Sequence, residues 1–357
     1  MNRIKLLIVI NLITVAIVFF FYDTFKIKHQ NKKFSSINES INALYLKNFA
    51  EENVTRIDYN VWLIYTKVGV DSPLKFKFQN LIENILNVST VFIKFHVIVD
   101  SNSRKIALAQ FTNVSSHSKN PFKWYFYDIN EVSNIMLDIV EVLTPHFSSK
   151  PGTYYSDALF YISLGLYRVA PADQDIAVML DCDLYFKDDI LLLFKEFDWF
   201  KSDALFGLAP ELTPVYRHVL HKYRLSTNTT FGSYYNSTSI ISHLPHPNGF
   251  QGYNSGVVLL NLRRIRESKV YSKVLSKSVV DYLVQKYMFK GHLGDQDFYT
   301  LLGYEYPNLI QTLECGFNRQ LCTWWKYHGY SDVFDKYFKC KHPIIVLHGN
   351  CNTKILS

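Results

Sequence analysis

The sequence of 357 residues predicts an α/β fold, in which helices flank a sheet of mainly parallel strands. Two short runs of β-branched and aromatic residues, 61–66 (VWLIYT) and 93–99 (IKFHVIV), enclose a helix-like segment, which is the pattern of a βαβ unit. The run 176–180 (IAVML) is continuously apolar, as in a central strand that is covered on both faces. We therefore expect one large domain.

The remaining segments extend this pattern toward the C-terminus. Residues 154–168 are helix-like, and residues 255–261 form a further apolar strand. Between them, residues 227–248 are polar and rich in Ser, His and Pro, which is typical of a long surface loop. The composition, with 48% hydrophobic and 19% charged residues, excludes a disordered or collagen-like chain.

A membrane-targeting segment precedes this domain. Residues 1–5 carry Arg3 and Lys5, and residues 6–22 are almost purely apolar, so we expect a cytosolic tail followed by a transmembrane signal anchor. Residues 19–22 are bulky where cleavage requires small side chains, which favours an uncleaved anchor over a cleaved signal peptide. Residues 23–56 are polar and are interpreted as a stem, and residues 57–357 form the domain behind it.

Two sets of residues disagree about the side of the membrane on which the domain lies. Four lysines follow the anchor, which by the positive-inside rule places the domain in the cytosol. Six Asn-x-Ser/Thr sequons indicate a lumenal domain instead, and we interpret the chain as a type II membrane protein. The lysines are Lys26, Lys28, Lys32 and Lys33, and the sequons begin at Asn38, Asn53, Asn87, Asn113, Asn228 and Asn236.

The placement of the cysteines favours the same compartment. Cys315, Cys322, Cys340 and Cys351 cluster near the C-terminus, whereas Cys182 stands apart. Four clustered thiols can form two disulfides in an oxidising lumen, with three connectivities open. A zinc site is the alternative, but the spacings lack a Cys-x-x-Cys pair.

The charge balance argues against one class of partner. The 38 Lys and Arg residues and 31 Asp and Glu residues give a net charge of +7, but the basic residues are scattered and match no nucleic-acid-binding motif. We therefore expect no nucleic-acid partner. A mild positive excess suits an anionic small molecule such as a nucleotide sugar, and ordinary surface lysines explain it equally well.

The acidic pairs of the sequence differ in their context. Asp-x-Asp begins at Asp173, Asp181 and Asp295, but only Asp181 and Asp183 directly follow a buried apolar strand. Ligands of open α/β sheets bind beyond the carboxyl ends of the strands, where two carboxylates repel each other unless a cation neutralises them. Mg²⁺ or Mn²⁺ suits oxygen ligands and stabilises a departing diphosphate. A helix N-cap beside a solvated acid is the alternative.

Several motifs carry a resemblance to a known family. They are Asp181-Cys182-Asp183, residues 253–261 (YNSGVVLLN), residues 294–297 (GDQD), and His348 with Lys354 six residues later. In this order they resemble the glycogenin-like retaining glycosyltransferases (GT8), which have the GT-A fold, a Rossmann-like mixed sheet flanked by helices. Residues 316–352 are similar to the xyloside α-1,3-xylosyltransferase subgroup. One departure from the wider family is that Gly349 directly follows the histidine and Cys351 takes the place of the usual glycine.

The resemblance implies roles for the matching residues. The metal ligands would be Asp181, Asp183 and His348, the diphosphate-facing lysine Lys354, and the residues near the anomeric carbon Gln296 and Asp297. The positions on the donor-sugar and uridine side would be Tyr65, Thr66, Asp100, Asn254, Ser255 and Gly256. Plainer alternatives are a structural histidine, a turn at Asn254 and close packing at Gly256.

The resemblance also implies an activity, the transfer of xylose from UDP-xylose, with Mn²⁺ or Mg²⁺, to a xylosyl-glucose glycan on EGF repeats such as those of Notch. It places the enzyme in the membrane of the endoplasmic reticulum. The acceptor residues would be Trp324 and Trp325; both could simply fill a core, but adjacent tryptophans cannot both face inward from one strand, so we expect one of them to stack on acceptor sugar or peptide. A glucoside xylosyltransferase, another UDP-sugar transferase of the family, and an inactive sugar-binding protein of this fold are the alternatives.

Retention of configuration bears on the mechanism. It usually requires a carboxylate nucleophile beside the anomeric carbon, and Asp297 is the nearest candidate by motif. Gln296 is a poor nucleophile because its amide carries no negative charge. We favour a front-face reaction, in which the leaving phosphate accepts the proton of the acceptor hydroxyl.

Overall fold

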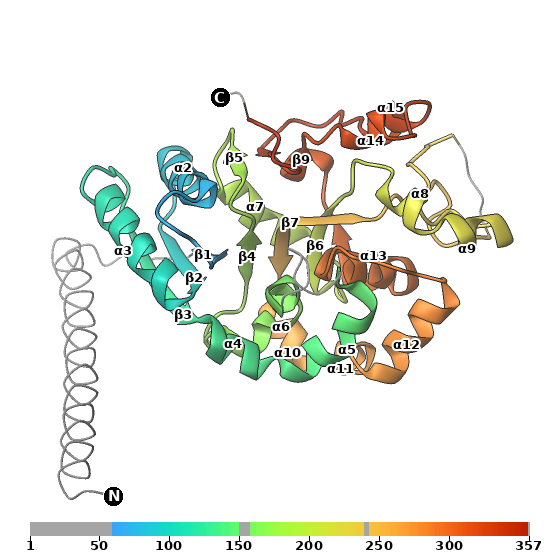
Figure 1. Ribbon diagram of the computed structural model, residues 1–357, viewed down its shortest axis with the longest axis horizontal. Coiled ribbons are helices and arrows are strands. Elements are labelled where there is room, and N and C mark those ends of the chain that lie inside the picture. Colours follow the sequence, from blue (N-terminus) through green and yellow to red (C-terminus); the bar gives the residue numbers. More distant parts are fainter. Residues whose placement is uncertain (1–58, 150–157, 239–242, 356–357) are drawn as a thin grey trace, which may run out of the picture. The chain divides into compact units, whose positions relative to one another are not determined.

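Two sheets organise the described part of the chain, which comprises residues 59–149, 158–238 and 243–355 of the computed structural model (Figure 1). The larger sheet has seven strands in the order β3-β2-β1-β4-β7-β6-β8, and the smaller has three in the order β5-β10-β9. In chain order the strands are β1 (Tyr59–Tyr65), β2 (Ile93–Val99), β3 (Phe122–Asp128), β4 (Ala177–Leu180), β5 (Leu184–Phe186), β6 (Phe206–Pro210), β7 (Tyr253–Leu260), β8 (Ile310–Thr312), β9 (Arg319–Gln320) and β10 (Val346–His348).

Helices lie on both sides of the large sheet. In Figure 1, α4 to α6 and α10 to α12 gather below it, whereas the segment with β9, α14 and α15 runs above it. The helices are α2 (Pro73–Val88), α3 (Ser101–Ser115), α4 (Ile129–Ile135), α5 (Leu137–Phe147), α6 (Ile162–Val169), α7 (Leu191–Lys195), α8 (Val215–Val219), α9 (His221–Ser226), α10 (Leu262–Glu267), α11 (Lys269–Val274), α12 (Lys277–Lys286), α13 (Asp295–Glu305), α14 (Trp324–Tyr327) and α15 (Phe334–Tyr337).

The expected cytosolic tail, anchor and stem, residues 1–56, lie outside the described residues. Among the helices of the described ranges, none has both the length and the apolar character that crossing a membrane requires. The βαβ unit is present as β1-α2-β2, and all four residues of β4 are buried. The loop expected at residues 227–248 is partly buried, because Phe231 is fully covered and stacks on Tyr304.

Strand β7 reverses the direction of the large sheet. β1 is parallel to β2 and β4, and β6 is parallel to β8, but β7 is antiparallel to both β4 and β6. The sheet is therefore mixed rather than parallel at this point. Since β7 begins where its neighbours end, residues 253–256 lie at the carboxyl edge of β4, and the Asp181 amide donates to the Gly256 carbonyl at 2.9 Å.

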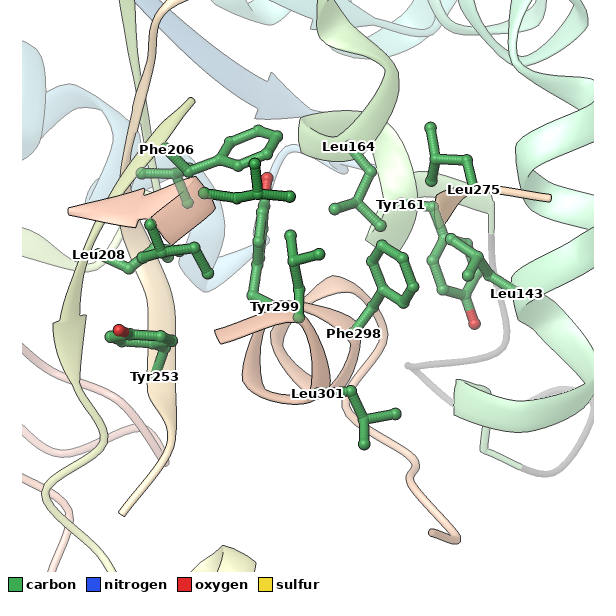
Figure 2. Close-up of a cluster of buried hydrophobic side chains, with 14 of the residues drawn as sticks. Leu143, Tyr161, Leu164, Phe206, Leu208, Tyr253, Leu275, Phe298, Tyr299 and Leu301 are labelled. Carbon is green, nitrogen blue, oxygen red and sulfur yellow. The ribbon is translucent and has the colours of Figure 1, made fainter. Parts of the chain in front are cut away.

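A large hydrophobic cluster fixes helix α13 against the sheet. Figure 2 shows Phe298, Tyr299 and Leu301 of α13 packed between side chains of β6 and β7 and side chains of α5 and α6. Eight of the eleven residues of α13 are buried. Because such interiors are close-packed, the first turn of α13, with the motif at residues 295–297, has a defined position at the edge of β7.

Candidate metal and donor site

Three predicted metal ligands come together at the carboxyl edge of β4. Asp181 follows β4, Asp183 precedes β5, and His348 ends β10, which pairs antiparallel with β5. One ligand atom from each residue lies within 4.8 Å of the other two. The Nε2 atom of His348 is 3.6 Å from Asp181 Oδ2 and 3.4 Å from Asp183 Oδ1. Two carboxylate oxygens and one imidazole nitrogen fit a divalent cation such as Mn²⁺ or Mg²⁺.

Opposite charges at this site shift the pKa values of its members. Burial alone would raise the pKa of Asp183, but the hydrogen bond and charge of His348 and the charge of Lys77 outweigh it and lower the pKa. Burial would likewise lower the pKa of His348, yet Asp183 and Asp181 raise it. Burial and the charge of Asp183 raise the pKa of Asp181 to about 6, although His348 opposes the rise, so the two carboxylates repel each other and a cation between them would relieve this repulsion.

Gly256 leaves the space in which the ring of His348 lies. A Cβ atom at this position would be 2.3 Å from Cε1 and 2.6 Å from Nδ1 of His348, closer than real Cβ contacts. The prediction that Gly256 belongs to the site therefore acquires a steric reason, although the residue need not touch a ligand.

We expect Gly256→Ala to weaken the binding of Mn²⁺ at least tenfold, because the added methyl group displaces the ring of His348, a metal ligand. Loss of a contact that orients a metal ligand typically weakens metal binding roughly 10–100-fold. Calorimetric titration with Mn²⁺ measures the change. Gly69→Ala is the matched control, since no atom lies within 4 Å of its added Cβ. Equal Mn²⁺ affinity of the two variants would contradict the steric argument.

The two acids of the motif at residues 295–297 have different hydrogen-bond partners. Asp295 accepts hydrogen bonds from Ser255 Oγ at 2.9 Å and from Ser163 Oγ at 2.5 Å. Asp297 is fully buried and accepts from two loop amides and from the hydroxyl of Tyr216. Burial raises the pKa of each carboxyl to about 7, although these hydrogen bonds oppose the rise. Gln296 lies between them, and the Ser255 amide donates to its Oε1 at 3.4 Å.

The predicted uridine-side residues lie at the ends of β1 and β2. Tyr65 is buried, stacks on Phe78 and donates to Gln110 at 2.8 Å, and Thr66 is buried beside it. Asp100 caps α3 by accepting from the amides of Asn102 and Ser103, and it also accepts from the amide of Lys67. These contacts shape the loop at this edge of the sheet.

The two tryptophans lie on α14, a short helix, and not on a strand, so the alternation on which their prediction rested does not apply. Trp324 is 50% exposed and stacks on His328 with 3.7 Å between ring centroids. Trp325 is half-buried and contacts His218 and Tyr330. One flat apolar face is therefore available to a ligand at Trp324.

Both expected disulfides are present in the tail. Cys315 pairs with Cys340 and Cys322 with Cys351, whereas Cys182 is free and buried. Cys351, which takes the place of a family glycine, has φ of 56° and so adopts the left-handed conformation that glycine usually supplies. The backbone geometry of a glycine is therefore retained there. Lys354, three residues further, is exposed.

For three residues of the site, the sequence predicted no role. Lys77 of α2 lies 3.3 Å from Asp183 Oδ2, with Asn352 Oδ1 at 3.2 Å from the same ammonium. Glu211 follows β6 and is buried, and its Oε2 accepts from Asn254 Nδ2 at 2.9 Å and from Gln296 Nε2 at 3.3 Å. Asn318 is fully buried and contacts both Asn254 and His348.

Comparison with known proteins identifies the family of the chain. No protein-family model matches it. Xyloside xylosyltransferase 1 of Mus musculus is 38% identical over 308 residues, which are 85% of this chain and 76% of the relative. The same protein of Homo sapiens is 38% identical over 84% of this chain and 75% of its own length. The crystal structure of the mouse enzyme in its apo form aligns with a TM-score of 0.76 over 84% of this chain and 100% of its own. With its mixed sheet of GT-A type, its Asp-Asp-His triad and this similarity, the chain belongs to the xyloside xylosyltransferase family of glycosyltransferases.

Proposed function

We propose that this xylosyltransferase transfers xylose from UDP-xylose, with retention of configuration, to a xylosyl-glucose glycan on EGF repeats such as those of Notch. The observation that carries the proposal is the 38% identity to two enzymes whose names specify xylosyl transfer to a xyloside. The triad of Asp181, Asp183 and His348 supports it, because it retains a complete set of ligands for a divalent cation.

Each part of the site has a task in this reaction. Asp181, Asp183 and His348 would hold Mn²⁺, with Mg²⁺ as the alternative, and the ion would stabilise the diphosphate charge as the sugar–phosphate bond breaks. The ammonium groups of Lys77 and Lys354 add positive charge for the phosphate oxygens. The donor sugar would lie beside Asn254, Ser255 and Gln296. The uridine would lie on the side of Tyr65, Thr66 and Asp100, and the acceptor would contact Trp324.

The state of the carboxylates favours the front-face reaction over a covalent intermediate. Both oxygens of Asp295, Asp297 and Glu211 accept hydrogen bonds from the protein. A carboxylate in such contacts is a weakened nucleophile, and a pKa of about 7 leaves Asp295 and Asp297 partly protonated at neutral pH. In the front-face reaction the departing phosphate oxygen accepts the proton of the acceptor hydroxyl, so none of these acids forms a bond to the sugar.

The compartment is part of the proposal. We infer a single-pass type II protein of the endoplasmic reticulum membrane, anchored by residues 6–22, with its catalytic domain in the lumen. Two disulfides in one tail support an oxidising compartment. Among the sequons in the described residues, Asn87, Asn113 and Asn228 are exposed, as glycosylation requires.

Transfer assays test the substrates directly. The full-length protein in detergent is combined with Mn²⁺, with UDP-xylose or UDP-glucose, and with an EGF repeat that carries xylosyl-glucose or glucose alone. We expect the mass of one pentose on the xylosylated repeat only, and far faster transfer from UDP-xylose, because a pocket filled against the hydroxymethyl group of glucose rejects the larger sugar. Addition to the glucosylated repeat would indicate a glucoside xylosyltransferase, and UDP binding without transfer would indicate an inactive sugar-binding protein.

Lys77 offers a second test of the donor site. Lys77→Met keeps most of the apolar length of the side chain and removes its charge. We expect UDP to bind about fivefold more weakly in the presence of Mn²⁺, because a partly exposed charged contact contributes on the order of 1 kcal/mol. Lys75→Met on the same helix is the control, since its ammonium lies 3.5 Å from the Val70 carbonyl instead. An equal loss in both variants would count against a phosphate contact of Lys77.

A further inference from the structure

A chain of buried hydrogen bonds leads from Glu211 to His348. Glu211 Oε2 accepts from Asn254 Nδ2 at 2.9 Å, and Asn254 Oδ1 accepts from Asn318 Nδ2 at 2.8 Å. Asn318 Oδ1 in turn lies 2.9 Å from Nδ1 of His348. All four side chains are at most 5% exposed, so water does not compete for these contacts.

The orientation of the amide groups in this series of hydrogen bonds is fixed at the Glu211 end. Burial raises the pKa of Glu211, but its Oε1 accepts from the Thr213 amide and its Oε2 from Gln296 Nε2, so the carboxyl acts as an acceptor and the NH₂ group of Asn254 turns toward it. The Gly256 amide, which only donates, contacts Asn254 Oδ1 at 3.1 Å and requires the same orientation. The oxygen of Asn254 then faces Asn318, whose NH₂ group also lies 3.4 Å from the Asn254 carbonyl. The oxygen of Asn318 is therefore left facing His348.

We propose that Asn318 is a positioning residue that accepts from Nδ1–H of His348, so that the lone pair of Nε2 faces a cation held between Asp181 and Asp183. An acceptor at Nδ1 requires a proton there, and the free nitrogen of a neutral imidazole is the one that can ligate a cation. Glu211 and Asn254 give Asn318 its orientation. The inference rests on the proposed metal site, because Nε2 lies 3.6 and 3.4 Å from the carboxylates of Asp181 and Asp183 and keeps a free lone pair only when a cation lies between them.

Two substitutions at one position separate this role from simple packing. Asn318→Leu has similar volume and removes the acceptor, so the tautomer of His348 is no longer fixed. Asn318→Asp keeps an oxygen that accepts from Nδ1–H, so it restores the tautomer. Asn84→Leu is the matched control. Asn84 is a buried amide whose side chain donates to the Phe186 carbonyl and accepts from the Phe186 amide, and it lies outside the series of hydrogen bonds from Glu211.

The first readout is spectroscopic and uses Mg²⁺, which is diamagnetic, as the bound cation. Full-length protein with ¹⁵N-labelled histidine is measured by long-range ¹H–¹⁵N correlation with Mg²⁺ and UDP, and His348 is identified by its loss in His348→Gln. We expect the Nδ1–H pattern in the wild type, in Asn318→Asp and in Asn84→Leu, and a changed pattern in Asn318→Leu. An Nε2–H pattern in the wild type, or an unchanged pattern in Asn318→Leu, would overturn the proposal. If Asn318→Leu does not fold, Asn318→Ala takes its place in the same comparison.

The second readout is the affinity for Mn²⁺ in the presence of UDP, measured from the electron paramagnetic resonance signal of the free ion. We expect Asn318→Leu to bind Mn²⁺ roughly 10–100-fold more weakly than the wild type, and Asn318→Asp to stay within a few-fold of it. Equal affinity of wild type and Asn318→Leu would contradict the role of Asn318. Absence of Mn²⁺ binding in the wild type would instead contradict the proposed metal site itself, whereas Mn²⁺ binding that Asn318→Leu leaves unchanged would contradict only the role of Asn318.

Discussion

Asp183→Asn is expected to lower kcat/KM for xylosyl transfer about 1,000-fold, because a bound divalent ion contributes several kcal/mol of charge stabilisation to the transition state and each ~1.4 kcal/mol is a factor of ten. The asparagine side chain occupies nearly the same volume but presents a neutral ligand. It also removes the negative charge that attracts His348 and Lys77, whose contacts with Asp183 are 3.4 and 3.3 Å. The loss therefore falls on both the ion and the diphosphate.

A surface acid provides the control for this variant. Asp175 belongs to another Asp-x-Asp pair, but its carboxylate is 59% exposed and lies 3.6 Å from Arg263 at the surface. Such pairs contribute roughly 0–1 kcal/mol, so Asp175→Asn should retain full transfer activity. Thermal unfolding of both variants shows that each is folded. Full activity of Asp183→Asn, or of the wild type in excess EDTA, would contradict a metal-dependent reaction.

The parts of the site that could be predicted from residues alone are those next to one another in the chain. Asp181 and Asp183 follow an apolar strand, and the general position of ligands at strand ends was sufficient to select them. Glu211 obeys the same rule, since it directly follows the buried strand β6, but a single acid gives a weaker signal than a pair. Its neighbours Asn254 and Gln296 were selected by resemblance.

Other parts depend on contacts between distant segments. Lys77 and Asp183 are 106 residues apart, and nothing in a helix such as α2 marks which of its lysines will face a carboxylate. The direction of β7 was also beyond prediction, because an apolar run indicates a buried strand but not whether it runs parallel to its neighbours. Asn318 lay within a recognised segment, yet its role depends on the spatial proximity of Asn254 and His348.

The tryptophans show a local error of a different kind. Alternation applies to a strand, in which successive side chains point to opposite faces. Residues 324–327 form one short helix, in which Trp324 stacks on His328 one turn later. A segment of four residues is too short for periodicity to distinguish a helix from a strand. The exposed tryptophan was therefore expected for a reason that the structure does not support.

The disulfide between Cys322 and Cys351 ties the metal site to the tail, and its removal is expected to destabilise the fold. The bond closes a segment with a separation of 29 residues, for which loss of chain entropy in the unfolded state predicts about 3–4 kcal/mol of stabilisation. Cys351 lies three residues after His348, and the Asn350 side chain accepts from the amides of Leu321 and Cys322. These contacts hold the segment after β10 beside β9.

Replacement of both Cys322 and Cys351 by serine should therefore lower the free energy of unfolding, measured in urea, and also weaken Mn²⁺ binding. The matched control is the pair Cys315 and Cys340, which closes a similar separation of 25 residues. Its removal should destabilise the protein by a similar amount, but it should change the affinity for Mn²⁺ less, because Cys340 lies eight residues before His348 and Cys315 approaches the triad only through Asn318, whereas Cys351 lies three residues after His348. Without its bond, residue 351 also loses the restraint that keeps a non-glycine side chain in the left-handed conformation, so the backbone after His348 is free to relax. Equal Mn²⁺ affinity of the two double variants would mean that the disulfide stabilises the fold without positioning the metal ligand.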